Sequence, residues 1–456
     1  MNNSFTDTII ALATPLGTSA LATIRLSGQR AIEIVQTKFK GKNLELQNSH
    51  TVHLGFITHN NKIIDEVLVT IFKDNKSFTG ENSVEISCHG SAVIIKEIIS
   101  AMVSAGARLA EPGEFSKRAF LNGKYDLTQV EAIADLINAE TENAKQVAFT
   151  QMRGGFSKRL REYRQRLIDF VALIELELDF SEEDAEFANR NELKELALAM
   201  RQSLKPLLAS YKLGNVIKQG INAVIAGKPN TGKSTLLNTL LQEEKSIVSE
   251  ISGTTRDAIE DTINIEGINF RFIDTAGLHN TTDPIESLGI ARTNEKLKKA
   301  QLILYLFDLS NFNITSFETE KQKIESLGIP YILIGNKVDI AQTKDLDKLT
   351  SKNFLFISAK EEINIEELKM KILSLFHINE IKQGDVLITN IRHIQHLEET
   401  DKSLERVISG IESKLSTDLL AQNIKHAMYS VGAITGEEIT SEHLLESIFS
   451  KFCIGK

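Results

Sequence analysis

Residues 227–234 read Gly-Lys-Pro-Asn-Thr-Gly-Lys-Ser, which is the pattern of a phosphate-binding loop. Glycines at Gly227 and Gly232 allow the backbone to turn so that several N–H groups face the phosphates of a nucleotide. The Lys233 ammonium can reach the β- and γ-phosphates, and the Ser234 hydroxyl can bind Mg²⁺. The segment therefore predicts a site for a nucleoside triphosphate.

The sequence around this loop has the pattern that such a loop requires. Residues 222–226 form a short apolar run, which predicts a buried strand, and residues 234–241 have the pattern of a helix. A chance glycine-rich turn would need neither a strand before it nor a helix after it. The context therefore favours the phosphate-binding loop over that alternative.

A second set of residues predicts that the base is guanine. Asn336-Lys-Val-Asp339 ends an apolar strand, and the Asp339 carboxylate can accept from N1–H and N2–H of guanine, which adenine cannot supply. Asn336 can bond N7 and brace the loop. Ser358-Ala-Lys360 ends the next strand, and the Ala359 N–H is expected to face guanine O6. Ligands of open α/β sheets bind at such strand ends, so these ordered segments predict a GTP-binding domain.

The segment Asp274-Thr-Ala-Gly277 completes the phosphate side of the predicted site. Asp274 is expected to hold a water on Mg²⁺, and the Gly277 N–H can meet the γ-phosphate. In Ras-like proteins a glutamine after this motif orients the attacking water, but here the position holds Leu278, which cannot do so. Another group must therefore position water and neutralise charge.

Length and composition are those of a globular chain with several domains. The chain has 456 residues, of which 42% are hydrophobic and 25% charged. Such a length predicts about three domains. The net charge of −9 argues against a broadly basic surface for nucleic acid but allows a local basic patch. The basic run at residues 158–166 is better explained as a solvated helix face than as a contact to nucleic-acid phosphates.

Cysteine content and apolar runs bear on the location of the protein. The two cysteines, Cys88 and Cys453, lie far apart in the sequence, which argues against a disulfide framework or a zinc site. The sequence has no run of 18 apolar residues, and its first residues lack the basic and apolar regions of a signal peptide. We therefore expect a cytoplasmic protein with no membrane partner.

Hydrophobic periodicity divides the chain into four segments. Residues 1–120 mix strand and helix patterns, residues 121–216 have helical spacing, residues 217–378 contain the GTP-binding pattern, and helical spacing returns in residues 379–456. Strands of the first segment are expected at residues 7–13, 21–26, 62–72 and 83–88, and its helices at 31–37 and 91–105. Two helical stretches around an α/β module predict one discontinuous helical domain with the GTP-binding domain inserted in it.

The chain carries further motifs outside the GTP-binding segments. They are Asp7-Thr-Ile-Ile-Ala-Leu-Ala-Thr-Pro15, Ile24-Arg-Leu-Ser-Gly28, Phe78-Thr-Gly-Glu-Asn-Ser-Val-Glu85, His89-Gly90, residues 112–127, Gly253-Thr-Thr-Arg-Asp257 and Cys453-Ile-Gly-Lys456. Together they resemble the tRNA modification GTPase family called MnmE or TrmE. The resemblance covers the whole chain, and the terminal tetrapeptide makes it specific.

The resemblance implies an activity that a phosphate-binding loop alone does not. Members of the family act with a flavoprotein called MnmG or GidA and add a carboxymethylaminomethyl or aminomethyl group at C5 of the wobble uridine in certain tRNAs. A 5,10-methylene- or 5-formyl-tetrahydrofolate provides the one-carbon unit. The implied fold is multidomain α/β and α. It has an N-terminal α/β folate-binding-like domain that forms a homodimer, a discontinuous helical domain and an inserted Ras-like P-loop GTPase domain.

Residue matching extends the resemblance to a folate site. Arg25, Glu85, Lys124 and Lys456 fall on the family's folate-binding positions. The chemistry is reasonable because a pterin ring offers donors to a carboxylate, and a folate tail offers carboxylates to Arg and Lys. Without the resemblance, each of these charged side chains would be interpreted as solvated.

The resemblance also implies the missing catalytic groups. Asn230 and residues 249–255 match the family's K⁺ site, with the Asn230 side-chain oxygen and the carbonyl oxygens of Ser249 and Ile251 as ligands. The ion would neutralise charge where an arginine finger otherwise acts. Glu286 matches the acid that orients the attacking water, although by residue type alone it fits a solvated helix start.

These arguments give the full set of predicted ligands. GTP is expected to contact Gly227, Asn230, Thr231, Gly232, Lys233, Ser234, Thr235, Ser249, Thr254, Thr255, Asp274, Gly277, Asn336, Lys337, Asp339, Ser358, Ala359 and Lys360. Mg²⁺ is assigned to Ser234 and Thr255, and K⁺ to Asn230, Ser249, Ile251 and Thr254.

The sequence also departs from the family pattern and leaves an alternative function open. The family often has Arg at the positions of His279 and Ser287, which weakens the expectation of charge pairing between GTPase domains there. Cys453 is expected to be packed rather than reactive. The alternative is a regulatory GTPase switch for RNA or ribosome assembly. Binding of 5-formyltetrahydrofolate to the N-terminal domain would distinguish the two functions.

Overall fold

The protein divides into two compact units, each with its own sheet and core. Its structure is a computed structural model that describes residues 6–179, 187–244, 261–272, 300–341, 354–376, 378, 386–437, 442–450, 452 and 455. The first unit comprises residues 1–134, 151–200 and 396–456. The second comprises residues 135–150 and 201–395.

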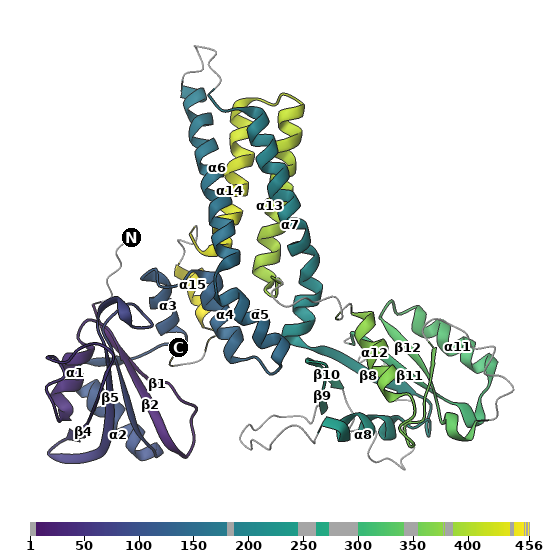
Figure 1. Ribbon diagram of the computed structural model, residues 1–456, viewed down its shortest axis with the longest axis horizontal. Coiled ribbons are helices and arrows are strands. Elements are labelled where there is room, and N and C mark those ends of the chain that lie inside the picture. Colours follow the sequence, from purple (N-terminus) through teal and green to yellow (C-terminus); the bar gives the residue numbers. More distant parts are fainter. Residues whose placement is uncertain are drawn as a thin grey trace. The chain divides into compact units, whose positions relative to one another are not determined.

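A sheet of seven described strands forms the N-terminal part of the first unit (Figure 1). The strands are β1 (Thr8–Leu12), β2 (Ser19–Ser27), β3 (Phe39–Lys40), β4 (Thr51–His59), β5 (Lys62–Phe72), β6 (Ser83–Gly90) and β7 (Ala107–Leu109). Their order is β3-β4-β5-β6-β2-β1-β7, and neighbours are antiparallel except β1 and β7. The four strands predicted from the sequence are present.

Strand β4 was not predicted, and its side-chain pattern explains why. Val52 and Leu54 are apolar but exposed, whereas His53 and Gly55 between them are buried. This arrangement reverses the usual alternation of apolar residues inside and polar residues outside. The hydrophobic pattern therefore does not indicate which face of β4 is buried.

One face of this sheet is covered by helices α1 (Ala31–Lys38) and α2 (Ala92–Ser104). Both helices were predicted. Ile98 of α2 is fully buried and belongs to the same core as Ile24 of β2 and Ile86 of β6. A short 3-10 helix, η1 (Asp74–Lys76), follows β5. The opposite face of the sheet carries the charged residues of the candidate site.

Helix α3 (Glu114–Leu121) follows the N-terminal sheet, and further described helices lie before and after the GTP-binding segment. They are α4 (Leu127–Ile137), α5 (Glu142–Met152), α6 (Gly155–Asp179), α7 (Arg190–Gln219), α13 (Ile391–Glu412), α14 (Thr417–Thr435) and α15 (Glu442–Phe449). In the first unit α6 and α14 lie side by side, and ion pairs such as Arg164–Glu437, at 2.9 Å, flank the contact (Figure 1). Segments on either side of the GTP-binding region in the sequence therefore pack together.

The second unit contains a mostly parallel sheet of six described strands. They are β8 (Ile221–Gly227), β9 (Asp261–Ile265), β10 (Ile268–Phe272), β11 (Leu302–Asp308), β12 (Tyr331–Asn336) and β13 (Phe354–Phe356). Their order is β13-β12-β11-β8-β10-β9, with only β9 and β10 antiparallel among these pairs. Helices of this unit are α8 (Lys233–Glu244), α11 (Ile314–Glu325) and α12 (Ile365–Leu375), with 3-10 helices η3 (Leu309–Asn311) and η4 (Val338–Ile340). The carboxyl ends of β8, β11 and β12 therefore meet at one edge.

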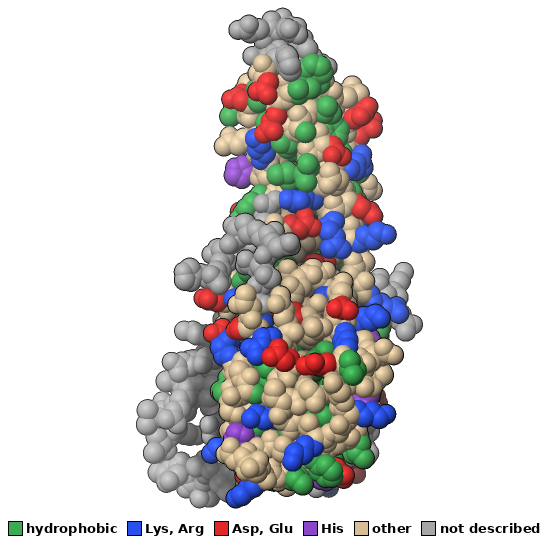
Figure 2. Space-filling view, turned by 90° about the vertical axis from the view of Figure 1, so that its left-hand side faces the viewer, with side chains coloured by type: hydrophobic (Ala, Val, Ile, Leu, Met, Phe, Trp, Pro, Cys, Tyr) green, Lys and Arg blue, Asp and Glu red, His purple; other side chains and the backbone are tan. Residues whose placement is uncertain are grey.

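The described surface fits the modest negative charge of the chain. On the face seen in Figure 2, Lys and Arg side chains alternate with Asp and Glu side chains and do not gather into a broad basic patch. No helix in the part of the chain that the structure describes is long and apolar enough to cross a membrane.

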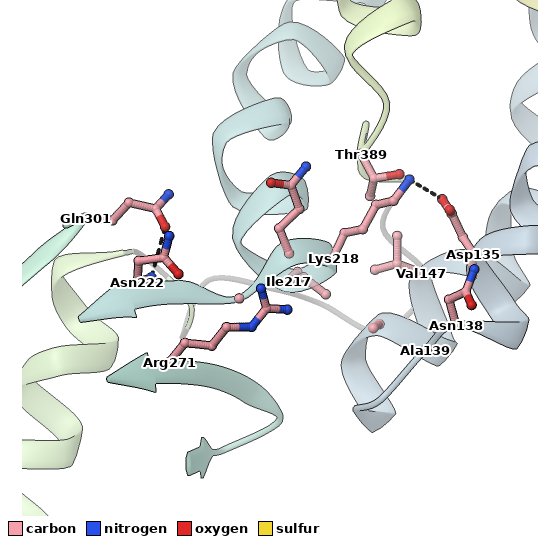
Figure 3. Close-up of a pocket in the computed structure, with 14 residues that line it drawn as sticks. Asp135, Asn138, Ala139, Val147, Ile217, Lys218, Asn222, Arg271, Gln301 and Thr389 are labelled. Atoms are coloured by element: carbon pink, nitrogen blue, oxygen red, sulfur yellow. Dashed lines mark hydrogen bonds and ion pairs between the residues drawn. The ribbon is translucent and has the colours of Figure 1, made fainter. Parts of the chain in front are cut away.

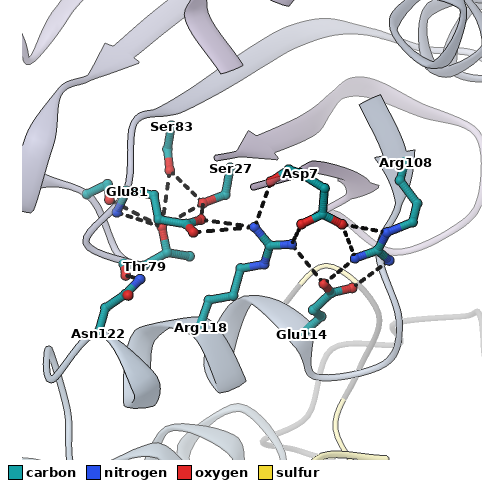
Figure 4. A network of polar contacts seen from close by, with 10 residues as sticks. Asp7, Ser27, Thr79, Glu81, Ser83, Arg108, Glu114, Arg118 and Asn122 are labelled. Atoms are coloured by element: carbon teal, nitrogen blue, oxygen red, sulfur yellow. Dashed lines mark hydrogen bonds and ion pairs between the residues drawn. The ribbon is translucent and has the colours of Figure 1, made fainter. Parts of the chain in front are cut away.

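A buried arginine joins helix α3 to the N-terminal sheet (Figure 4). Arg118 is 0% exposed, and its guanidinium donates to Asp7 Oδ1 at 2.7 Å, to Glu114 Oε1 at 3.0 Å and to Glu81 Oε1 at 3.3 Å. Arg108 adds a second cation, 2.6 Å from Glu114. Burial raises the pKa of Glu114, but hydrogen bonds from Arg108, a backbone N–H and Arg118 hold the pKa below its ordinary value. The network therefore balances three carboxylates with two guanidinium groups.

We predict that Arg118→Met strongly destabilises the N-terminal sheet. The change removes the fully buried cation of this network, so Asp7 and Glu114 keep only the Arg108 guanidinium and Glu81 loses its cationic partner in the network. Breaking such a pair costs about 3–5 kcal/mol. Native-state hydrogen exchange of β1 and β2 amides in the full chain should show this loss. Arg30→Met, which removes an exposed pair with Glu33, should leave exchange unchanged. Equal exchange in both variants would contradict the assigned role.

Candidate functional site

The phosphate-binding loop lies between β8 and α8, as predicted. Gly227 and Gly232 have φ angles of +146° and +93°. A Cβ atom at Gly227 would lie 2.5 Å from the Leu306 carbonyl oxygen, and one at Gly232 would lie 2.2 Å from Asn336 Nδ2. Both positions therefore require glycine for conformation and for space.

The charged and hydroxyl groups of the loop lie at the start of α8. Lys233 Nζ donates to the carbonyl oxygens of Gly227 and Lys228, at 3.0 and 2.9 Å. Burial lowers the pKa of the Lys233 ammonium. Ser234 and Thr235 follow in the first turn of the helix, whose N-terminal end favours anions. The arrangement can hold a polyphosphate.

Asn336 connects the phosphate-binding loop to the segment that follows β13. Its side chain is 3% exposed; Nδ2 donates to the Thr231 carbonyl at 2.8 Å, and Oδ1 accepts from the Ala359 N–H at 2.9 Å. The bracing role predicted for Asn336 is confirmed. In the structure the Ala359 N–H donates to Asn336 Oδ1, and its contact with guanine O6 stays a prediction. Ser358 beside it is buried, and Lys360 is exposed.

The guanine-reading segment is held by a residue that the sequence analysis missed. Lys337 has a φ of +68°, and its Nζ lies 2.6 Å from Oδ2 of Asp308 at the end of β11. Burial raises the pKa of Asp308, but hydrogen bonds from Lys337 and Ser310 bring the pKa below its ordinary value. Asp339 is exposed, so its carboxylate can accept from a ligand. A carboxylate at the end of a parallel strand was the signal that could have identified Asp308.

Asn230 lies at the exposed tip of the phosphate-binding loop, with a φ of +63°. Apart from Ser234, the other residues assigned to the K⁺ and Mg²⁺ sites, to the γ-phosphate or to catalysis lie outside the described residues, as do two residues at the C-terminus. They are Ser249, Ile251, Thr254, Thr255, Asp274, Gly277, Glu286, Cys453 and Lys456. Among the described residues, no group of three or more His, Cys, Asp or Glu side chains could hold a metal ion.

The structure brings two of the four predicted folate residues together in the first unit. Arg25 and Glu85 face each other on β2 and β6, with Nη2 2.8 Å from Oε1, and both side chains are partly exposed. The Arg25 guanidinium lies over the rings of Phe78 and Phe115, at 5.7 and 5.9 Å from their centroids. Charged groups beside aromatic rings suit a flat, polar heterocycle.

Of the other two predicted folate residues, Lys124 lies among the described residues and Lys456 does not. Lys124 Nζ donates to the Asn75 carbonyl at 2.6 Å, and no described contact joins it to Arg25 or Glu85. The expectation that Lys124 belongs with this pair is therefore not supported by contacts in the structure. Lys456 is outside the described residues, but the preceding Gly455 is buried against the end of β1, where a Cβ would lie 2.3 Å from the carbonyl oxygen of Leu12.

A cavity of about 350 Å³ lies at the other end of β8 from the phosphate-binding loop (Figure 3). Lys218 and Asp135 form an ion pair of 2.7 Å at its wall, and Arg271 of β10 also lines it. Its position near the start of β8 separates it from the strand ends that carry the nucleotide residues. The cavity is therefore distinct from the GTP site.

The chain is similar to known proteins over nearly its whole length. A family described as GTP-binding protein TrmE N-terminus matches residues 8–124, and the MnmE helical domain matches residues 127–453. The tRNA modification GTPase MnmE of Cytophaga hutchinsonii is 51% identical over 99% of this chain and 98% of its own. The protein of the same name from Flavobacterium psychrophilum is 48% identical over 99% of both chains.

The solved structure of Aquifex aeolicus Era bound to GDP·AlF4⁻ is 27% identical in sequence to this chain. The match covers 40% of this chain and 66% of the Era chain. Its TM-score is 0.27, so the family assignment does not rest on it. The sequence relatives and the two family matches carry the assignment instead, since they span nearly the whole chain. The chain belongs to the MnmE (TrmE) family.

Proposed function

We propose that this protein is a GTP hydrolase that acts in tRNA modification. The observation that carries the proposal is the Asn336 side chain, which joins the phosphate-binding loop at Thr231 to the guanine-reading loop at Ala359. A single amide thereby holds both halves of a GTP site together. Relatives 51% and 48% identical are named tRNA modification GTPases, which supports tRNA as the molecule modified.

The reaction that we propose places a carboxymethylaminomethyl or aminomethyl group at C5 of the wobble uridine. A tetrahydrofolate derivative provides the one-carbon unit, and a flavoprotein of the MnmG (GidA) type is the partner. The Arg25–Glu85 pair beside Phe78 and Phe115 supports a folate site in residues 1–120. Nucleoside analysis of tRNA from cells that lack this protein tests the proposal, and an unchanged wobble uridine would reject it.

GTP hydrolysis is proposed to use two cations. Mg²⁺ would bind with the nucleotide, and K⁺ would take the place of an arginine finger. Ser234 and Thr255 would hold Mg²⁺, and Asn230 with residues 249–255 would hold K⁺ beside the charge that develops during phosphoryl transfer. Glu286 would orient the attacking water. The exposed side chain of Asn230 at the loop tip supports its availability as a ligand.

We also propose that the N-terminal sheet forms the interface of a homodimer. Exposed apolar residues gather on the neighbouring strands β4 and β5, namely Val52, Leu54, Phe56 and Leu68. Leu54 and Leu68 are direct cross-strand neighbours, so the patch is continuous there. Exposed apolar patches of this kind mark interaction surfaces. A monomeric mass by light scattering at micromolar concentration would contradict this assignment.

The first prediction from the proposed function concerns recognition of the guanine base. Asp339→Asn should weaken GTP binding about 10- to 150-fold and improve xanthosine triphosphate binding, because the exposed carboxylate can accept from guanine N1–H and N2–H. Xanthine exchanges one of these donors for an acceptor, which an amide can pair with. Fluorescence titration with both nucleotides measures the change. Unchanged GTP affinity would show that this loop does not read guanine.

The second prediction concerns folate. Arg25→Ala and Glu85→Ala should each weaken 5-formyltetrahydrofolate binding about 10- to 150-fold, and the double variant should lose less than the product. The two side chains are in contact, so their effects are coupled. Calorimetry on the full chain measures folate affinity, with GTP affinity and the exposed Arg30→Ala as controls. Strict additivity would show that the pair does not bind folate as one unit.

The third prediction concerns the cation. GTP turnover should be much faster in K⁺ than in Na⁺, because a cage of fixed carbonyl and amide oxygens distinguishes ions by radius. Asn230→Ala should lose that difference, since it removes one ligand oxygen, while Asn238→Ala on the exposed side of α8 should keep it. Steady-state phosphate release in each salt measures both. Full K⁺ stimulation of Asn230→Ala would place the ion elsewhere.

A further inference from the structure

A histidine–aspartate pair lies on the same sheet as Arg25 and Glu85 but makes separate contacts. Nδ1 of His89 in β6 lies 2.8 Å from Oδ1 of Asp65 in β5, and the His89 backbone N–H donates to Oδ2 at 2.9 Å. The Asp65 side chain is only 8% exposed, and its Oδ1 also accepts from the Glu66 N–H at 3.0 Å. Three donors therefore fix the carboxylate, and the carboxylate fixes the imidazole.

These contacts determine which nitrogen of the ring is available. A carboxylate only accepts hydrogen bonds, so Nδ1 of His89 carries the hydrogen and the neutral imidazole has its lone pair on Nε2. The His89 side chain is 65% exposed, and Nε2 has no partner in the described part of the chain. An imidazole oriented by a buried carboxylate, with an open second nitrogen, is arranged to accept a proton.

The position of His89 relates it to the folate residues. Side chains alternate along a strand, so His89 and Glu85 lie on one face of β6, whereas Ile86 and Cys88 lie on the core face. Leu21 of β2 is opposite His89, in the same strand pair in which Arg25 is opposite Glu85. The two polar pairs are four residues apart, or about 13 Å along the strand. Strand β6 therefore contributes one residue to each pair, with Arg25 of β2 as the partner of Glu85 and Asp65 of β5 as the partner of His89.

Gly455, near the C-terminus, lies beside β1, which is the neighbour of β2 in the sheet. Gly455 is buried against Leu12 and Ala13, and the Ala13 N–H donates to the Thr23 carbonyl at 2.8 Å. Thr23 lies between Leu21 and Arg25 on β2, opposite Ser87. Gly455 therefore packs against the end of β1 that lies next to Thr23 of β2.

The neighbouring thiol does not offer the same chemistry. Cys88 is buried on the core face of β6, where Sγ lies 3.7 Å from the Ala22 carbonyl oxygen. Burial and the nearby Asp65 carboxylate raise the pKa of this thiol to about 11, so it is protonated at neutral pH. The imidazole of His89, not the Cys88 thiol, is the open basic group of this stretch.

We propose that Nε2 of His89 is a proton acceptor for the one-carbon chemistry and that Asp65 is its positioning residue. The inference rests on the proposed function, in which an amine becomes attached to a one-carbon unit. The N–H bond of a protonated amine breaks, its electron pair stays on the amine nitrogen, and the proton moves to Nε2. This proton transfer leaves the amine nitrogen neutral, with a free electron pair available for bonding to the one-carbon unit. The imidazolium keeps its Nδ1–H bond to Asp65, whose negative charge stabilises it.

The test uses a variant that preserves the contact with Asp65. In His89→Asn the side-chain amide can occupy the place of Nδ1 and donate to Asp65, but nothing replaces Nε2. With the full chain, its flavoprotein partner, tRNA and ammonium or glycine, the initial rate of amine incorporation should fall about 100-fold or more. Affinity for 5-formyltetrahydrofolate and the rate of GTP hydrolysis should stay as in the natural chain. Added imidazole should accelerate His89→Gly.

The matched control is His50→Asn. His50 is an exposed histidine of the same domain with a φ of +64°, a conformation that asparagine tolerates well. It should modify tRNA at the natural rate.

The outcomes separate this inference from the proposed function. If the natural chain fails to incorporate an amine, the proposed function fails with it. If the natural chain is active and His89→Asn is equally fast, only the role of His89 is overturned. Loss of folate affinity in His89→Asn, or no acceleration of His89→Gly by imidazole, would assign His89 to the structure of the sheet instead.

Discussion

The GTP site depends on one buried amide. Asn336 is the last residue of β12, and its side chain bonds a carbonyl of the phosphate-binding loop and an N–H of the segment after β13. Both groups are backbone atoms that would otherwise be buried without these partners, at a cost of about 1–3 kcal/mol each. The close approach also explains Gly232, since a Cβ there would lie 2.2 Å from Asn336 Nδ2. One side chain thus determines the residue type of another segment and the spacing of two ligand-binding loops.

The N-terminal sheet follows a different constraint, the two-residue period of a strand. On β6 the odd-numbered Glu85 and His89 face one way, and the even-numbered Val84, Ile86 and Cys88 face the core. This separation allows a strand with a fully buried face to present charged groups on the other. Each polar group named on this face then has a partner on a neighbouring strand, Arg25 for Glu85 and Asp65 for His89. Stability and chemistry are therefore assigned to opposite faces of the same strand.

Sequence patterns predicted much of this architecture because short-range rules govern it. The phosphate-binding loop, the strands that end at Asn336 and Phe356, and the alternation of β5 and β6 all follow from spacing within about ten residues. Contacts between distant segments were not predictable in this way. Asp308 lies 29 residues from Lys337, and Asp65 lies 24 residues from His89. The same holds for Arg118, because its partners Asp7 and Glu81 come from segments that only the folded sheet brings together.

The Arg25–Glu85 pair also limits what its site can bind. In the structure the two charges neutralise each other at 2.8 Å beside aromatic rings. A ligand that offered only an anion would engage Arg25 and leave the Glu85 carboxylate partly buried without its partner, and such an unpaired charge is costly. A ligand that offers a donor group to Glu85 and an acceptor to Arg25 replaces both halves of the pair at once. A pterin ring presents donors and acceptors along one edge, so we propose that this pair favours a heterocycle of that kind over a simple carboxylate or phosphate.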